Sequence, residues 1–284
     1  MRVEIVISTR RGGSGTEGTT RVYRAPGYDP TAMCERDLTV VTGGSAGIGL
    51  ALARRLVRPD GQLLLVARGA ERLAAAGREL QCETLVADLA TEAGVSVLAA
   101  RLSESPRIRL LINNAGGPFR TPLLEHHPDE AARAIDLLYL AMVRVTAAAW
   151  PGLVAARGSI VNVVSVAGTV ATGSAPHYAA AKHAAIAWSR GLHVEAAAVG
   201  VHVLTANPGP VATAAFPHDR LRDHRWLRHA VITDDRCAET IVKALQRRRS
   251  ESFHPEWWRV AGVAQAIAPG TMARLARRSR ERFG

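Results

Sequence analysis

Lysine is almost absent from this chain of 284 residues. It occurs only at Lys182 and Lys243, whereas 34 positions hold arginine. Cysteine is scarce as well: Cys34, Cys82 and Cys237 are an odd number and lack the paired spacing of a metal site. A disulfide framework or a structural metal is therefore not expected, and a reduced, cytoplasmic protein is the simplest interpretation.

Long hydrophobic runs are missing too. An apolar stretch around residues 137–150 is interrupted by Arg144. A membrane-spanning helix needs about 18 or more consecutive apolar residues, so we expect no membrane span. The N-terminus has no compact apolar core after its first charges, and we expect no secretory signal.

Negative charge is in short supply, and the positive excess is uneven. The formal net charge is +11, and residues 220–284 contain 15 arginines and lysines against 7 acidic residues. A basic tail can bind nucleic acid, anionic lipid or an anionic substrate. It can equally be a solvated helix face in an arginine-rich chain. We favour the solvated face and expect no nucleic-acid partner, because no helix-turn-helix pattern or interleaved aromatic residues accompany the charge.

The first 36 residues differ from the rest of the chain. Residues 10–24 are rich in glycine, threonine and arginine and have almost no apolar side chains, which predicts disorder. Residues 3–7 would form at most an isolated strand, and Met33 is an alternative start of translation. We therefore expect a poorly ordered N-terminal extension over residues 1–36, a main domain over 37–250 and a basic C-terminal extension over 251–284.

Apolar runs of strand length alternate with helical stretches from residue 38 onward. The runs are residues 38–41, 63–66, 84–86, 110–112, 159–164 and 201–204, and helical spacing is clearest over 48–57 and 131–149. Short strands that are apolar throughout are buried on both faces, which indicates a parallel sheet covered by helices. With 48% apolar residues, the chain is expected to form a single α/β domain, a doubly wound parallel sheet in three layers.

The first predicted strand leads into a glycine-rich turn, Thr42-Gly43-Gly44-Ser45-Ala46-Gly47-Ile48-Gly49, and a helix follows. Glycines at such a turn let the backbone approach a pyrophosphate, and the helix N-terminus adds N–H groups and a positive dipole end. A plain tight turn is the alternative. The strand before, the helix after and a second strand about 20 residues on favour dinucleotide binding.

The second strand ends in Ala67-Arg68 instead of an acidic residue. An acidic side chain here would bind the ribose 2′-hydroxyl of NAD, whereas a nearby arginine suits the 2′-phosphate of NADP. Arg68 can also be an ordinary surface residue of an arginine-rich chain. We favour NADP(H) over NAD(H) as the cofactor.

Together these motifs resemble the classical short-chain dehydrogenases/reductases, from about residue 37 to about residue 250. The resemblance implies a Rossmann-type fold. Besides Arg68, it implies that the cofactor is contacted by residues in each motif: Gly43, Ser45, Gly47, Ile48, Gly49, Asp88, Asn114, Ala115, Gly116, Tyr178, Lys182, Pro208, Gly209, Val211 and Thr213. Each motif alone is modest, but their order and separations are very specific.

Tyr178 and Lys182 resemble the catalytic pair of the family, and Ser165 resembles its catalytic serine. Residues four apart in a helix share one face, so both side chains of the pair point at one site. A phenol titrates near pH 10, and a neighbouring ammonium lowers its pKa. Arginine cannot pass a proton onward, which accounts for a lysine at this position. The alternatives are a chance spacing on a solvated helix and an ordinary serine at the end of a strand.

The resemblance implies a role for each of the three. Tyr178 is the general acid and base, Lys182 lowers its pKa and binds the cofactor ribose, and Ser165 holds the substrate oxygen. One residue of the family pattern is missing, however. The family usually has an asparagine in the helix after the fourth strand, and alignment of residues 134–141 places Leu138 there. The proton relay must then use another water path.

The missing asparagine leaves other reactions open. An epimerase, a dehydratase or a C=C or C=N reductase can use the same scaffold, and a non-catalytic NADP-binding regulator is a further alternative. We favour an NADP(H)-dependent oxidoreductase that acts on a carbonyl or secondary alcohol. The resemblance also implies a homodimer or homotetramer.

The predicted substrate side is rich in apolar and aromatic residues. In the family, the chain after the Pro208-Gly209 motif closes over the substrate. In this sequence that part contains Phe216, Trp226, Trp257, Trp258 and the apolar residues 263–267. An apolar small molecule is therefore the expected substrate, and the C-terminal extension is expected near its entrance, although these side chains can equally be core. The segment from His218 to His229 is a candidate lid. Its three histidines lack metal spacing, so no metal is expected.

Overall fold

The computed structural model describes residues 4–6, 22–24, 37–58, 61–117, 119, 128–170, 175–213 and 231–283. The chain divides into two units, Met1–Glu35 and Arg36–Gly284. In the first unit, β1 (Glu4–Val6) pairs antiparallel with β2 (Val22–Arg24). The expected N-terminal strand is therefore paired instead of isolated, because Val22 and Tyr23 favour β structure within the arginine-rich segment.

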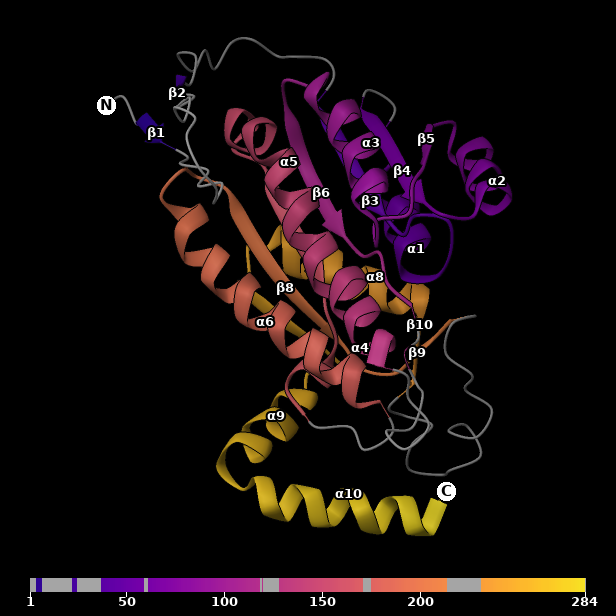
Figure 1. Ribbon diagram of the computed structural model, residues 1–284, viewed down its shortest axis with the longest axis vertical. Helices are drawn as coiled ribbons and strands as arrows, with labels where there is room; N and C mark the ends of the chain where they lie inside the picture. The colour runs from indigo at the N-terminus through magenta and orange to yellow at the C-terminus, as the bar shows by residue number, and fades with distance from the viewer. Residues whose placement is uncertain are drawn as a thin grey trace. The chain divides into compact units, whose positions relative to one another are not determined.

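Seven parallel strands form the sheet of the second unit, in the order β11-β8-β7-β6-β3-β4-β5 (Figure 1). The strands are β3 (Leu38–Thr42), β4 (Gln62–Ala67), β5 (Glu83–Val86), β6 (Ile108–Asn113), β7 (Ser159–Val163), β8 (His202–Pro208) and β11 (Glu251–His254). The chain runs outward from β3 to β5 and then crosses back to β6 on the other side of β3. This reversal confirms the predicted doubly wound, Rossmann-type sheet.

Helices cover both faces of the sheet and enclose two separate cores. One core lies under α1 (Gly47–Leu56), α2 (Ala70–Leu80) and α8 (Asp234–Gln246), and the other under α3 (Glu92–Ser103), α5 (Ala141–Ala156) and α6 (Pro176–Ala197). Along β4, Leu63 and Leu65 belong to the first core, whereas Leu64 and Val66 belong to the second. Successive side chains of a strand point to opposite faces, so burial on both sides requires the continuous apolar runs of the sequence.

A long helical stretch crosses the second face. It consists of α4 (Pro128–Ile135), the π-helical turn η2 (Asp136–Leu140) and α5. Residues Asp129–Ala156 are long and apolar enough to cross a membrane, since they contain an 18-residue window with a mean hydropathy of 1.5. Half of that window, however, is buried within the protein. Since α5 packs on β6 and α3, we interpret the stretch as a core helix of the α/β domain.

The sheet continues past the expected domain boundary at residue 250. Strand β11 pairs with β8, with Phe253 opposite Asn207. Its sequence, Glu-Ser-Phe-His, is not an apolar run, because this edge strand buries polar side chains such as Ser252 and His254. The remaining elements are η3 (Val166–Gly168), the parallel pair β9 (Val211–Ala212) and β10 (Ile232–Thr233), α9 (Trp258–Ile267) and α10 (Pro269–Phe283).

Candidate active site

The candidate site lies where the order of the strands reverses. The glycine-rich turn follows β3, and Asn114-Ala115-Gly116 follows its neighbour β6. In open α/β sheets, ligands bind outside the carboxyl ends of the strands at this switch point. The topology therefore brings two of the predicted cofactor segments to one place.

The glycine-rich turn has the geometry of an anion cradle. Gly43 and Gly47 have φ angles of 65° and 55°, in the left-handed region that favours glycine. A Cβ atom on Gly47 would lie 3.1 Å from Cγ2 of Thr213, so the turn meets the segment of predicted cofactor contacts that ends at Thr213. Helix α1 has no side-chain cap and no acidic residue in its first turn. Its N–H groups and positive dipole end therefore suit the pyrophosphate of a dinucleotide.

Thr42 and Asn114 tie the turn to the end of β6. The Thr42 hydroxyl donates to the carbonyl oxygen of Ile112 at 3.1 Å and accepts the backbone N–H groups of Asn114 and Ala115 at 2.9 and 3.0 Å. The Asn114 amide donates to the carbonyl oxygens of Thr42 and Gly43 at 3.1 and 3.2 Å. The Asn114 side chain is thus engaged in holding the turn, and Thr42 is a support that was not among the predicted site residues.

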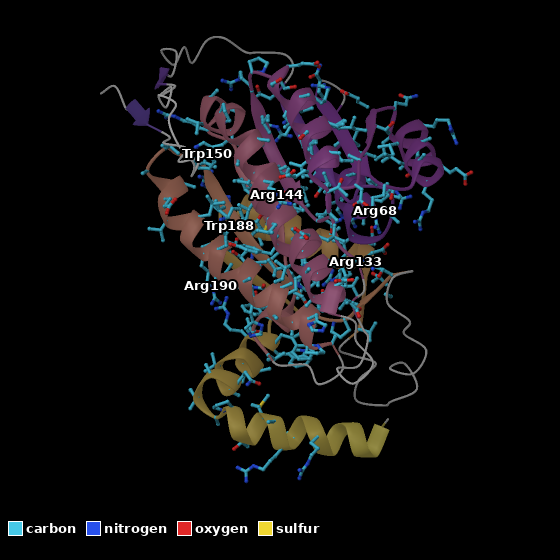
Figure 2. All side chains as sticks on the ribbon, viewed as in Figure 1. Arg68, Arg133, Arg144, Trp150, Trp188 and Arg190 are labelled. Carbon is cyan, nitrogen blue, oxygen red and sulfur yellow. The ribbon has the colours of Figure 1, made fainter. Side chains whose placement is uncertain are left out.

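Arg68 and Asp88 lie at the ends of the neighbouring strands β4 and β5. Figure 2 shows Arg68 on the side of the sheet that carries α1 and α2, away from Trp188 on α6. The Arg68 Nη1 atom is 3.9 Å from Oδ2 of Asp88, and the two side chains are 60% and 42% exposed. Because so long and exposed an ion pair is weak, the guanidinium can turn to another anion.

Tyr178 and Lys182 occupy the first two turns of α6. The Lys182 side chain is only 5% exposed. Its Nζ atom lies 5.7 Å from the centre of the Tyr178 ring and donates to the carbonyl oxygen of Val163 at 3.3 Å. Burial lowers the pKa of Lys182 from 10.5 to about 8, because an ammonium loses hydration in the interior. The amine can therefore gain or lose a proton near neutral pH.

Ser165 stands two residues beyond Val163, at the N-terminus of the turn η3. Its hydroxyl oxygen accepts the N–H of Ala167 at 3.1 Å, and the side chain is half-buried. This contact uses the oxygen as an acceptor, so the hydroxyl hydrogen can still be donated. The turn η3 packs directly on α6. Ser165 and Lys182 are therefore carried by elements that touch each other.

Leu138 lies in η2 and is only 1% exposed. It belongs to an apolar cluster with Leu137 and Ala181, and Tyr178 packs against that cluster. The position where the family has a polar amide is thus filled here by a buried hydrocarbon beside the tyrosine.

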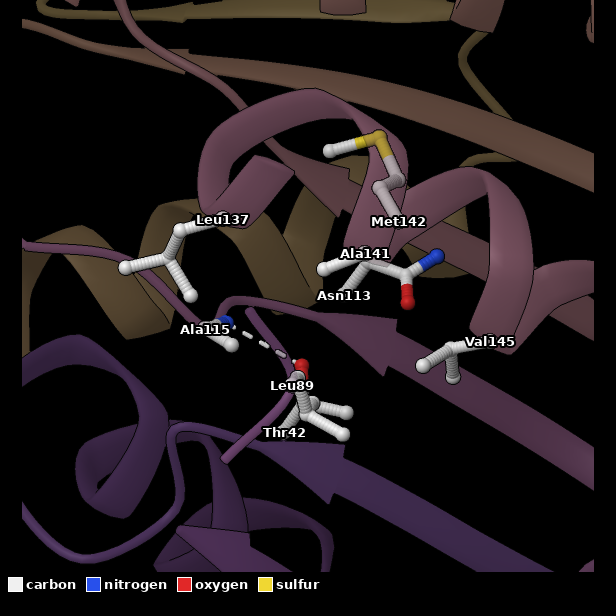
Figure 3. A pocket seen from close by; sticks show the side chains of 8 residues that line it. All are labelled: Thr42, Leu89, Asn113, Ala115, Leu137, Ala141, Met142 and Val145. Carbon is white, nitrogen blue, oxygen red and sulfur yellow. Dashed lines mark hydrogen bonds between the residues drawn. The ribbon is translucent and has the colours of Figure 1, made fainter. Parts of the chain in front are cut away.

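A small pocket opens next to this turn (Figure 3). Its lining residues are Thr42, Leu89, Asn113, Ala115, Leu137, Ala141, Met142 and Val145. Asn113 donates through Nδ2 to Oγ1 of Thr146 and Oδ1 of Asn162, both at 2.9 Å, while its own buried Oδ1 has no partner within the part of the chain that the structure describes. A buried carbonyl that needs a donor is the kind of group that holds an internal water.

The amide of Asn113 starts a chain of buried polar groups that sequence reasoning did not find. Asn162 donates to Oγ of Ser189 at 2.8 Å, and that hydroxyl is 2.7 Å from Oγ1 of Thr205. Asn162, Ser189 and Thr205 are all 0% exposed. The chain links β6, β7, α6 and β8, and its only sequence signal was polar residues inside apolar strands.

The Pro208-Gly209 segment is held by the C-terminal part of the chain. The N–H of Gly209 donates to the carbonyl oxygen of His254 at 2.8 Å. A Cβ atom on Gly209 would lie 2.4 Å from Nε1 of Trp258, so the indole packs directly on this glycine. The ring of Trp257 stacks on that of Trp258 with centroids 4.3 Å apart. The first residues beyond 250 therefore help to build this side of the site.

Other predicted positions are not placed with the site. Phe216, Trp226 and the histidines His218, His224 and His229 lie outside the described residues, as does Cys34. Within the described ranges, no group of three or more histidine, cysteine or acidic side chains is arranged to hold a metal ion.

The order and geometry of these motifs agree with a comparison of the whole sequence. A family profile described as short chain dehydrogenase matches residues 37–223. The chain belongs to the short-chain dehydrogenase family. It is 30% identical to 1-deoxy-11-beta-hydroxypentalenate dehydrogenase of Streptomyces avermitilis, over 78% of this chain and 90% of that protein.

Solved structures of other dehydrogenases have the same fold. One from Sphingobium yanoikuyae, in complex with NADPH, has a TM-score of 0.69 and 29% identity, and the match covers 81% of this chain and 94% of that one. The bulky-bulky ketone specific alcohol dehydrogenase of Comamonas testosteroni has a TM-score of 0.68 at 24% identity, with 81% and 93% covered. This short-chain dehydrogenase is therefore an oxidoreductase that uses a nicotinamide cofactor.

Proposed function

We propose that the protein is an NADP(H)-dependent oxidoreductase that interconverts a carbonyl group and a secondary alcohol on an apolar small molecule. The observation that carries this proposal is the buried Lys182, whose Nζ atom lies 5.7 Å from the centre of the Tyr178 ring. Nearly every other cation in the chain is arginine. A buried amine with its pKa lowered to about 8 is suited to proton transfer rather than to a permanent ion pair.

The three catalytic residues would divide the reaction between them. A bound nicotinamide cofactor supplies or accepts the hydride. In reduction, Tyr178 gives its phenolic proton to the substrate oxygen while Ser165 donates a hydrogen bond to that oxygen. Protonated Lys182 then favours the phenolate left on Tyr178. In the oxidation of an alcohol, Tyr178 takes the hydroxyl proton back.

The cofactor would bind along the edge of the sheet. The turn from Gly43 to Gly49 would hold the pyrophosphate, Arg68 the 2′-phosphate and Asp88 the adenine. The segments Asn114–Gly116 and Pro208–Thr213, with Ser45 and Ile48 of the turn, would complete the contacts. The positive φ angles at Gly43 and Gly47 and the uncapped N-terminus of α1 support this placement.

Exchange of Tyr178 for phenylalanine tests the catalytic role. With a panel of apolar ketones and NADPH, we expect Tyr178→Phe to lower kcat by about 10²–10⁴-fold and to weaken NADPH binding far less than that. The matched control is Tyr139→Phe, since Tyr139 is also half-buried but lies in η2. Full activity of Tyr178→Phe would remove the tyrosine from the proposed mechanism.

A second reaction class is favoured by one observation. Leu138 is buried where the family pattern has an asparagine, so this position cannot organise a relay water. A C=C or C=N reductase needs a different path for its proton, and the same panel should therefore include activated alkenes and imines. Turnover of these substrates but not of ketones would replace the carbonyl proposal.

We include a cytoplasmic location in the same proposal. Cys82 and Cys237 are free thiols, which agrees with the reducing cytoplasm.

Trp150 on α5 and Trp188 on α6 are only half-buried (Figure 2), and large aromatic side chains of this kind support a homodimer or homotetramer. Light scattering of the eluted protein tests the oligomeric state.

A further inference from the structure

Exposed hydrophobic side chains gather near the C-terminus. Among the described residues, nine large hydrophobic side chains are exposed, and five of them lie between positions 257 and 275. They are Trp257 (50%), Val260 (70%), Val263 (52%), Ile267 (79%) and Leu275 (53%). Contiguous apolar surface of this kind marks an interaction site more often than scattered single residues do.

Helix α9 has two distinct faces. On its inner face, Trp258 packs on Gly209, and a Cβ atom on Gly262 would lie 3.0 Å from Cβ and Oγ1 of Thr169. Val260, Val263 and Ile267 are three and four residues apart, so they form one stripe along the helix. All three are exposed, and the helix therefore presents an apolar outer face while its inner face covers the candidate site.

The helix that follows this stripe is strongly basic: Arg259 is the only charged residue of α9, and the five further arginines of this region lie on α10. Residues 259–283 contain six arginines and one acidic residue, Glu281. A single residue, Ala268, separates α9 from α10. On α10, Arg274 and Arg277 are exposed together with Leu275. An apolar stripe on one helix, followed at once by an arginine-rich helix, is the composition of a segment that lies in the surface of a membrane.

We propose that α9 and α10 bind the surface of a membrane that contains anionic lipids. The stripe of Val260, Val263 and Ile267 would enter the boundary between headgroups and acyl chains, and the arginines would bind lipid phosphates. A second copy of the chain is a poorer occupant, because pairing two such surfaces would bring like charges together. Nucleic acid would match the charge but would leave the apolar stripe in water.

The proposal replaces the interpretation of the basic tail as a merely solvated face. It does not depend on the reaction the enzyme performs. Its test is sedimentation of the full-length protein with vesicles of phosphatidylcholine mixed with phosphatidylglycerol, and with vesicles of phosphatidylcholine alone. We expect binding to the mixed vesicles, weak binding to the neutral ones, and release at high salt, where the Debye length falls to about 3 Å at 1 M.

Two pairs of variants separate the apolar and the charged contributions. Val260→Glu/Ile267→Glu should lower the partition coefficient by at least about tenfold, whereas Val194→Glu, at a 73% exposed valine of α6, should not. Arg274→Gln/Arg277→Gln should weaken binding by about fivefold for each arginine. The matched control is Arg72→Gln/Arg78→Gln, two exposed arginines of α2.

Three results would overturn the proposal. The first is no sedimentation with the mixed vesicles. The second is equal binding by the Val260→Glu/Ile267→Glu variant, which would mean that the stripe does not enter the membrane. The third is a change of oligomeric state in that variant, measured by analytical ultracentrifugation without lipid, together with no vesicle binding by the wild type. That outcome would identify the stripe as a contact between subunits.

Discussion

The carbonyl oxygen of Lys182 lies so close to Gly168 that no larger residue fits at position 168. A Cβ atom there would be 2.6 Å from this oxygen and 2.5 Å from Cδ1 of Ile186. Gly168 ends the turn that begins after Ser165, and Lys182 lies on the helix that carries Tyr178. One close contact between a turn and a helix thus sets the separation of Ser165 from Lys182, two of the proposed catalytic residues.

Gly168→Ala should therefore disturb the site as well as the fold. The added methyl group has no room, so we expect a loss of about 1–3 kcal/mol in the free energy of unfolding and a fall in kcat/KM of up to about 100-fold. Urea denaturation and steady-state kinetics measure the two effects. Gly191→Ala in the same helix is the control, because among the described residues no atom outside its chain neighbours and its own helix backbone lies within 4 Å of its Cβ position. This variant should be more stable by up to about 1 kcal/mol.

Lys182 makes stability depend on pH. Its folded pKa is lowered from 10.5 to about 8, so between these values the unfolded chain binds more protons than the folded one. The free energy of unfolding then rises with pH across this window. Below pH 8 both states carry the charge, and the full cost of burying it is present. The increase amounts to about 3 kcal/mol at most, since each pKa unit corresponds to about 1.4 kcal/mol.

Lys182→Met isolates this effect. The variant should be more stable than the wild type near pH 7, and the difference should shrink as the pH rises from about 8 to 10.5. Denaturant titrations at several pH values provide the measurement, and Lys243→Met, at a lysine that is 57% exposed, controls for loss of a surface lysine. A constant difference at all pH values would mean that Lys182 is not titrating in this window.

Arg68 should distinguish the two nicotinamide cofactors. Its ion pair with Asp88 is long, at 3.9 Å, so the guanidinium can bind the 2′-phosphate of NADPH. Arg68→Ala is expected to weaken the binding of NADPH at least tenfold, about 1.4 kcal/mol, and to leave the affinity for NADH unchanged. A fluorescence titration with each cofactor measures both. Arg78→Ala, at an exposed arginine of α2, should alter neither. An equal loss of affinity for both cofactors would show that Arg68 does not bind the 2′-phosphate.

The buried polar chain should behave as one unit. Ser189→Ala removes the acceptor of Asn162 Nδ2 and the hydroxyl partner of Thr205, whereas Asn162→Ala removes one of the two acceptors of Asn113 Nδ2 and the donor to Ser189. We expect each change to cost about 1–3 kcal/mol and the double variant to cost less than their sum, with a coupling of about 0.5–3 kcal/mol. Thermal denaturation of all four proteins completes the cycle, and strict additivity would contradict a connected chain.

The sequence carried most of the fold because two properties are local. Strands that are buried on both faces must be apolar throughout, so the runs at residues 38–41, 63–66 and 110–112 revealed β3, β4 and β6. Glycine at positions 43 and 47 marked a turn with positive φ. Strand β11 was not predicted because it is not an apolar run. Its buried Ser252 and His254 form a 2.9 Å hydrogen bond with each other and need no apolar neighbours in sequence.

The candidate site was less accessible to sequence reasoning because its supports are contacts across the sheet. The spacing of Tyr178 and Lys182 on a helix is visible in the chain, but the acceptor of the lysine, the carbonyl oxygen of Val163, is a backbone atom without a sequence signal. The same holds for Thr42, which binds residues 72 and 73 positions away. Such partners follow from strand order, which propensity and periodicity do not specify.

The scarcity of lysine also determines how this protein responds to chemistry aimed at amines. Apart from the α-amino group, an acylating reagent finds two targets: Lys243 on the surface of α8 and Lys182 inside, beneath Tyr178. The mass of the labelled chain then distinguishes molecules in which α6 stays packed, with Lys182 protected, from those in which α6 has moved and Lys182 is labelled. Because arginine occupies the other cationic positions, the chain contains its own two-site reporter of access to the active site.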